Sequence, residues 1–149
     1  MEIAVLPHVD EHTTVVAAEP AAVWRGIGDV LDRSFASVRS ARLARLLGCA
    51  DRTVSGPRPV AEGSTFTGLR VTSARPDREL VLVGRHRFST YALVLRLDEA
   101  GPGRTRLRAE TRARFPGPVG GLYGLLVIGT GGHAVAVRRL LSAVRRGAE

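Results

Sequence analysis

Residues 104–115 read R-T-R-L-R-A-E-T-R-A-R-F and form the most regular stretch of the chain. Charged side chains occupy every second position from Arg104 to Arg114. The positions between them hold small or apolar residues such as Leu107 and Ala109. Such strict alternation predicts a half-buried strand of an antiparallel sheet, with one face toward solvent and the other toward an apolar interior.

Period-two patterns also fill the chain before this strand. They predict strands over 79–88 and 90–98, whose inward positions include Leu80, Leu82, His86 and Phe88, then Tyr91, Leu93, Leu95 and Leu97. Turn signals lie at Pro76-Asp77, before the first of these strands, and at Gly101-Pro102-Gly103, after the second. Thr- and Val-rich residues 11–18 and the segment 64–73 are further expected strands, and 54–60 is at best an edge strand. We therefore expect a sheet of about six or seven strands.

Helical spacing follows the first strand and closes the chain. Pro20 is placed to begin a helix over 21–32, and a second short helix is expected to start at Ser34 and end at Gly48. A long helical pattern covers 119–146, and the glycine run at 129–132 should kink the helix or leave its surface there without side chains. The predicted class is α+β.

The composition of the chain limits the classes of function that are expected. The 149 residues suit one domain over 1–149. The net charge is +8 and every basic residue is Arg, but no aromatic side chain interleaves with the charged face of 104–114, so nucleic-acid binding is not expected.

Cys49 is the only cysteine, which fits a reducing cytoplasm. The uncharged stretch from Arg114 to Arg138 is long enough to span a bilayer, but its glycines and His133 argue against stable insertion.

Several short motifs, in this order along the chain, resemble those of one superfamily. They are His12-Thr13-Thr14-Val15-Val16 followed by Glu19-Pro20-Ala21-Ala22-Val23-Trp24, then Glu62-Gly63-Ser64, Pro76-Asp77-Arg78-Glu79-Leu80 and Gly103-Arg104-Thr105-Arg106-Leu107. The pattern resembles the START-like superfamily, also called the polyketide cyclase and dehydrase-like or SRPBCC group. The resemblance implies a helix-grip fold, in which a curved sheet wraps around a long C-terminal helix and leaves a ligand cavity between them.

We consider three functions, because such folds host many activities. The first hypothesis is binding of a hydrophobic small molecule, such as a lipid, polyketide or aromatic compound, by a monomer or homodimer without a cofactor. The second is a polyketide cyclase or aromatase that uses the same cavity. The third is a peripheral membrane or partner-binding protein that uses the Arg-rich face.

Candidate site residues follow from the inward faces. His86 and Tyr91 are candidates for hydrogen bonding to a ligand or for proton transfer. Arg70 is an anchor for an anion if Phe66 and Arg70 face inward, and a surface charge if Leu69 and Val71 do. The expected ligand-binding set is Trp24, Phe66, Leu82, His86, Phe88, Tyr91, Leu93, Tyr123, Leu126 and His133. We expect no metal site: the H-x-x-E-H match at 8–12 precedes a strand, whereas zinc proteases carry that motif on a helix.

Overall fold

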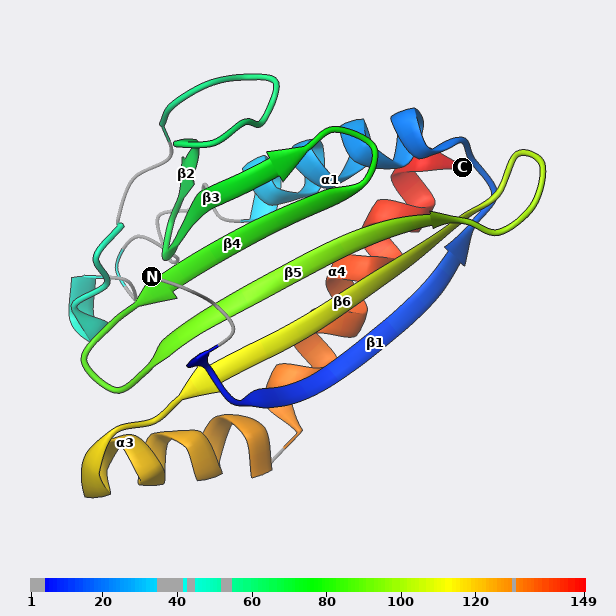
Figure 1. Ribbon diagram of the computed structural model, residues 1–149. Helices are drawn as coiled ribbons and strands as arrows, with labels where there is room; N and C mark the ends of the chain where they lie inside the picture. Colours follow the sequence, from blue (N-terminus) through cyan, green and yellow to red (C-terminus); the bar gives the residue numbers. More distant parts are fainter. Residues whose placement is uncertain (1–4, 35–41, 43–44, 52–54, 130) are drawn as a thin grey trace.

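The computed structural model of the protein describes residues 5–34, 42, 45–51, 55–129 and 131–149. Its six strands form one antiparallel sheet in the order β1-β6-β5-β4-β3-β2 (Figure 1). The strands are β1 (His8–Val16), β2 (Thr65–Phe66), β3 (Leu69–Arg75), β4 (Glu79–Arg85), β5 (Thr90–Glu99) and β6 (Thr105–Arg114). The helical segments are α1 (Pro20–Ser34), α3 (Gly117–Gly124), the π-helical turn η2 (Leu125–Gly129) and α4 (Gly132–Ala148). The predicted α+β helix-grip class is confirmed.

Strand β6 lies inside the sheet, between β1 and β5. Its alternation is the predicted one, because Thr105, Leu107, Ala109, Thr111 and Ala113 are all buried on the inner face. The inner face of the sheet meets α1 and α4, which lie side by side behind the strands (Figure 1). Their shared core includes Ile27, Leu31, Leu82, Leu107, Leu141 and Val144.

The segment 64–73, expected as one strand, is instead a hairpin. Strand β2 pairs with β3 across a turn at Thr67 and Gly68, and Gly68 has a φ of +85°. Only glycine adopts that conformation at little cost, and it reverses the chain between two runs of strand formers. The reversal explains why both Phe66 and Leu69 are buried although alternation along one strand would separate them.

The expected C-terminal helix is divided in two. The segment Gly117–Gly129 and helix α4 are bent by 52° relative to each other. Gly131, with a φ of +79°, is the N-cap of α4, so the predicted kink at the glycine run is a complete break between two helical segments.

The second short helix expected after Ser34 falls largely outside the described residues, although 45–47 are helical. Within the described ranges no single helix is long and apolar enough to cross a membrane; the bent pair together meets that length and composition.

Candidate functional site

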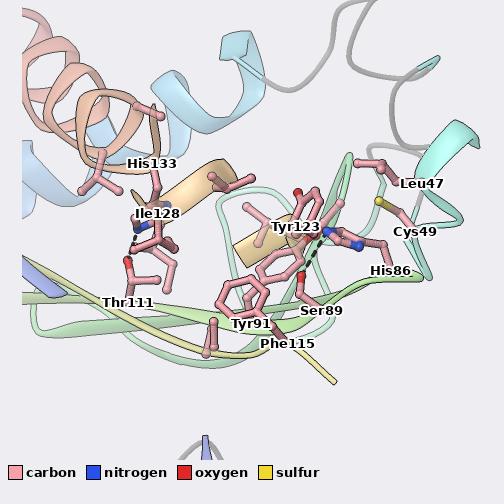
Figure 2. Close-up of a pocket in the computed structure, with 18 of the residues that line it drawn as sticks. Leu47, Cys49, His86, Ser89, Tyr91, Thr111, Phe115, Tyr123, Ile128 and His133 are labelled. Atoms are coloured by element: carbon pink, nitrogen blue, oxygen red, sulfur yellow. Dashed lines mark hydrogen bonds between the residues drawn. The ribbon is translucent and has the colours of Figure 1, made fainter. Parts of the chain in front are cut away.

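A pocket of about 350 Å³ opens between the inner face of the sheet and the segments α3, η2 and α4. Strands β5 and β6 form its floor, and the helical segments cover it (Figure 2). Its lining is largely apolar and includes Leu47, Leu69, Leu93, Ala113, Phe115, Val127, Ile128, Val137 and Leu140. The polar lining residues gather toward two ends, one at His86 and Ser89 and the other at Thr111 and His133 (Figure 2).

His86 follows β4 directly, in the turn that leads to β5. Its Nδ1 accepts the backbone N–H of Phe88 at 3.1 Å, so Nδ1 carries no hydrogen. The single ring hydrogen therefore lies on Nε2 and is donated to Ser89 Oγ at 3.0 Å. Burial lowers the pKa of His86, which agrees with a neutral imidazole.

Aromatic rings surround His86 at this end of the pocket. The Tyr123 ring meets it edge-on at a centroid distance of 4.9 Å, and the Tyr91 ring lies at 5.6 Å. Phe88 stacks on Tyr123 at a centroid distance of 5.5 Å, and the Phe115 ring lies 6.2 Å from that of Tyr123. Burial raises the pKa of both tyrosines, so both phenols stay protonated at neutral pH.

Tyr91 reaches across β4 to the β2–β3 turn. Its hydroxyl donates to the Gly68 carbonyl oxygen at 2.6 Å. The ring passes over Gly84, the residue paired with Tyr91 in the β4–β5 ladder, where a Cβ atom would overlap both the ring and the Gly68 oxygen. Glycine at 84 therefore makes room for Tyr91, and the hydroxyl of Tyr91 is engaged by the protein rather than offered to the pocket.

His133 marks the other end, at the start of α4. Its Nε2 lies 2.9 Å from Thr111 Oγ1 on β6 and 3.5 Å from Asp10 Oδ1 on β1. Asp10 is the ladder neighbour of Thr111, and its second oxygen lies 3.2 Å from His12 Nε2. The imidazole is therefore hydrogen-bonded to β6 and lies close to a carboxylate of β1, next to open space.

The burial of His86 gives a testable pH dependence. The unfolded chain takes up a proton near 6.5, the ordinary pKa of histidine, while the folded chain resists protonation. The contribution of His86 to stability is therefore complete above that value and is lost as the pH falls below it. We expect an NMR titration midpoint for His86 below 6.5, and a His86→Gln variant whose unfolding free energy depends less on pH between about pH 7 and pH 5. A midpoint at or above the ordinary value would contradict the assignment.

The pocket brings together only part of the ligand-binding set expected from the sequence. His86, Tyr91, Leu93, Tyr123 and His133 line it. The other five lie elsewhere: Phe66 and Leu82 are fully buried in the core, Trp24 packs against that core, Phe88 stacks behind Tyr123, and Leu126 is 58% exposed on the outer side of η2. Their roles in binding stay predictions.

Arg70 resolves the question of strand face left open by the sequence. Its side chain is 55% exposed and pairs with Asp51 at 2.9 Å, whereas Leu69 and Val71 are buried. Arg70 is therefore a surface charge, outside the pocket.

The outer face of the sheet carries the Arg ladder with acidic partners. Arg108 pairs with Asp98 at 2.8 Å, and Glu110 receives Arg96 at 3.2 Å and Arg112 at 3.4 Å. Cross-strand pairs of opposite charge are an ordinary feature of a solvated sheet face. The arrangement favours a structural role for these arginines over a patch of unopposed positive charge.

Sequence reasoning missed Ser89 and Cys49, and it singled out Thr111 only as an inward position. Ser89 lies in a turn, where no periodicity marks a side chain as inward. Cys49 reaches the pocket wall from the segment before β2. Among the described residues, no group of three or more His, Cys, Asp or Glu side chains is arranged to hold a metal ion.

No family model and no curated protein sequence matches the chain. Solved structures do match its fold. A protein from Nitrosospira multiformis is 14% identical with a TM-score of 0.60, and the match covers 94% of this chain and 95% of that one. CalU16 from Micromonospora echinospora is 17% identical with a TM-score of 0.55, covering 93% and 79%. Ara h 8.0201 is 9% identical with a TM-score of 0.54, covering 93% and 95%. At these identities the similarity concerns the fold, and the chain has the helix-grip fold of the START-like, or SRPBCC, proteins.

Proposed function

We propose that the protein binds a hydrophobic small molecule in the pocket between β5, β6 and the α3–η2–α4 segments. The observation that carries this proposal is the open volume of about 350 Å³, which lies in the range of small-molecule sites, roughly 300–1,000 Å³. An apolar lining with a few polar groups is also the usual character of such sites.

The chain's one cysteine allows no internal disulfide, which supports a reducing compartment such as the cytoplasm.

Hydrogen bonding at His86 favours binding over cyclase or aromatase chemistry. A general base needs a lone pair directed at the substrate. In His86 the Nδ1 lone pair accepts the Phe88 amide, and Nε2 donates to Ser89. Tyr91 donates to Gly68 and Arg70 lies on the surface, so none of these candidate catalysts directs a proton acceptor into the pocket.

Native mass spectrometry of freshly purified protein tests the proposal. We expect a retained apolar compound, or, for emptied protein, a melting temperature raised by an uncharged aromatic probe such as N-phenylnaphthylamine, because a ligand that binds only the folded state stabilises it. Absence of a retained compound, together with no shift from any lipid, polyketide or aromatic compound in a panel, would overturn the proposal.

A further inference from the structure

Two pairs, each a histidine hydrogen-bonded to a side-chain hydroxyl, lie at opposite ends of the pocket. At one end His86 Nε2 meets Ser89 Oγ at 3.0 Å, and at the other His133 Nε2 meets Thr111 Oγ1 at 2.9 Å. All four residues line the pocket, and both hydrogen bonds are drawn in Figure 2. Ser89 is 3% exposed and Thr111 is 5% exposed, so both residues are buried.

We assign the imidazole as the donor and the hydroxyl as the acceptor in each pair. For His86 this direction follows from the Phe88 amide, which occupies Nδ1 and leaves the ring hydrogen on Nε2. For His133 the Asp10 carboxylate oxygen lies 3.5 Å from Nε2, and a hydrogen on that nitrogen, rather than a lone pair, faces the negative charge. That Asp10 oxygen is buried and has no hydrogen-bond partner among the described residues.

A hydroxyl that accepts a hydrogen bond still has its own hydrogen to donate. Among the described residues, the hydroxyls of Ser89 and Thr111 make no hydrogen bond besides the one to their histidine. A buried donor without an acceptor destabilises the protein, and an oxygen atom of a bound ligand would relieve this. Each end of the pocket therefore suits a ligand oxygen.

The register of the sheet gives the spacing of the two ends. Thr111 on β6 pairs with Leu93 on β5, and Ser89 lies four residues before Leu93 along the same extended chain. At about 3.3 Å per residue, the backbone positions of the two hydroxyl-bearing residues are about 13 Å apart along the strand. Each ligand oxygen lies about 2.8 Å from its hydroxyl, so the matching oxygens would be about 8 Å apart for a ligand between the hydroxyls and up to about 13 Å apart for one that lies over them. The wall between them is apolar and includes Leu93, Ala113 and Phe115.

From this geometry we infer that the ligand is an elongated, rigid and mostly apolar molecule with a hydrogen-bond-accepting oxygen, such as a carbonyl, at each end. Ser89 binds one oxygen and Thr111 binds the other, with His86 and His133 holding the two hydroxyls in position. The inference rests on the proposed function and adds the chemical class of the ligand to it.

Androstenedione is a suitable probe, because it carries a ketone at each end of a rigid four-ring skeleton. Its affinity, and that of the two matched mono-ketones, is measured by displacement of N-phenylnaphthylamine from the full chain. We expect the diketone to bind about tenfold more tightly than either mono-ketone, the contribution of one hydrogen bond. Ser89→Ala should make the diketone equal to one mono-ketone, and Thr111→Val should make it equal to the other.

Two further variants separate this result from a loss of folding. Thr111→Ser keeps the hydroxyl and should retain the preference for the diketone. Thr90→Val alters the neighbour of Ser89, which lies outside the pocket lining, and should leave the affinities for the diketone and the mono-ketones unchanged. If the fluorophore binds but the diketone binds no more tightly than the mono-ketones, the two-ended ligand class is wrong and the proposed function stands. If neither the fluorophore nor any ketone binds, the proposed function fails and the ligand class with it.

Discussion

Replacing Gly84 with alanine should lower the free energy of unfolding by about 3 kcal/mol, at the upper end of the range for overpacking. The added Cβ would overlap the backbone oxygen of Gly68 and the ring of Tyr91, and neither can move without breaking their hydrogen bond. The variant therefore loses packing of β4 on β5 and the bond that holds the β2–β3 turn. Chemical denaturation measures the change, and a melting temperature about 10 °C lower should accompany it in a chain of this size.

Gly121→Ala is the matched control for this substitution. Gly121 lies in α3, and a Cβ there would meet no atom within 4 Å. Alanine favours a helix over glycine by up to about 1 kcal/mol, so this variant should be neutral or slightly more stable. Equal stability of Gly84→Ala and the wild type would show that Tyr91 does not pack over Gly84 as described.

Ala113→Phe should weaken the binding of N-phenylnaphthylamine by at least about 100-fold, which corresponds to about 2.7 kcal/mol. Ala113 lies on β6 opposite Tyr91, and its methyl group forms part of the pocket floor. A phenyl ring at this position projects into the open volume and occupies the space a ligand would need. A fluorescence titration measures the loss, and the melting temperature should change little, because the ring fills space rather than displacing packed atoms.

Arg106→Phe places the same side chain on the same strand but on the exposed outer face. This variant should bind the fluorophore as the wild type does. If Ala113→Phe is folded and binds with unchanged affinity, the pocket at β5 and β6 is not where the ligand lies.

The sheet could be predicted from the sequence to within a residue or two where one face is solvated. In 104–114 each outward position is charged, so alternation alone defines β6 and its inner face. The β2–β3 hairpin could not be predicted in the same way. Its turn consists of Thr67 and Gly68 within a run of strand-forming residues, and a single glycine does not distinguish a reversal from a bulge.

The site was harder to predict, because periodicity shows which face a residue is on but not what lies opposite it. Leu82 and Leu93 are cross-strand neighbours. Leu82 belongs to the cluster with Ile27 and Leu31 of α1, where helices fill the space. Leu93 lines the pocket, which η2 and α4 cover without filling. The position of an open volume depends on where helices end and bend, which local patterns in the sheet do not encode.

Methyl NMR of the protein titrated with N-phenylnaphthylamine tests the central claim most directly. Binding in the pocket predicts chemical-shift changes at the lining methyl groups of Leu93, Ile128 and Leu140. The apolar outer side of α3 and η2, with Val119 at 62%, Leu122 at 58% and Leu125 at 67% exposed, should be unaffected. Shifts confined to these exposed methyl groups, with the lining groups unchanged, would contradict the account, because the hydrophobic molecule would then bind the surface rather than the pocket.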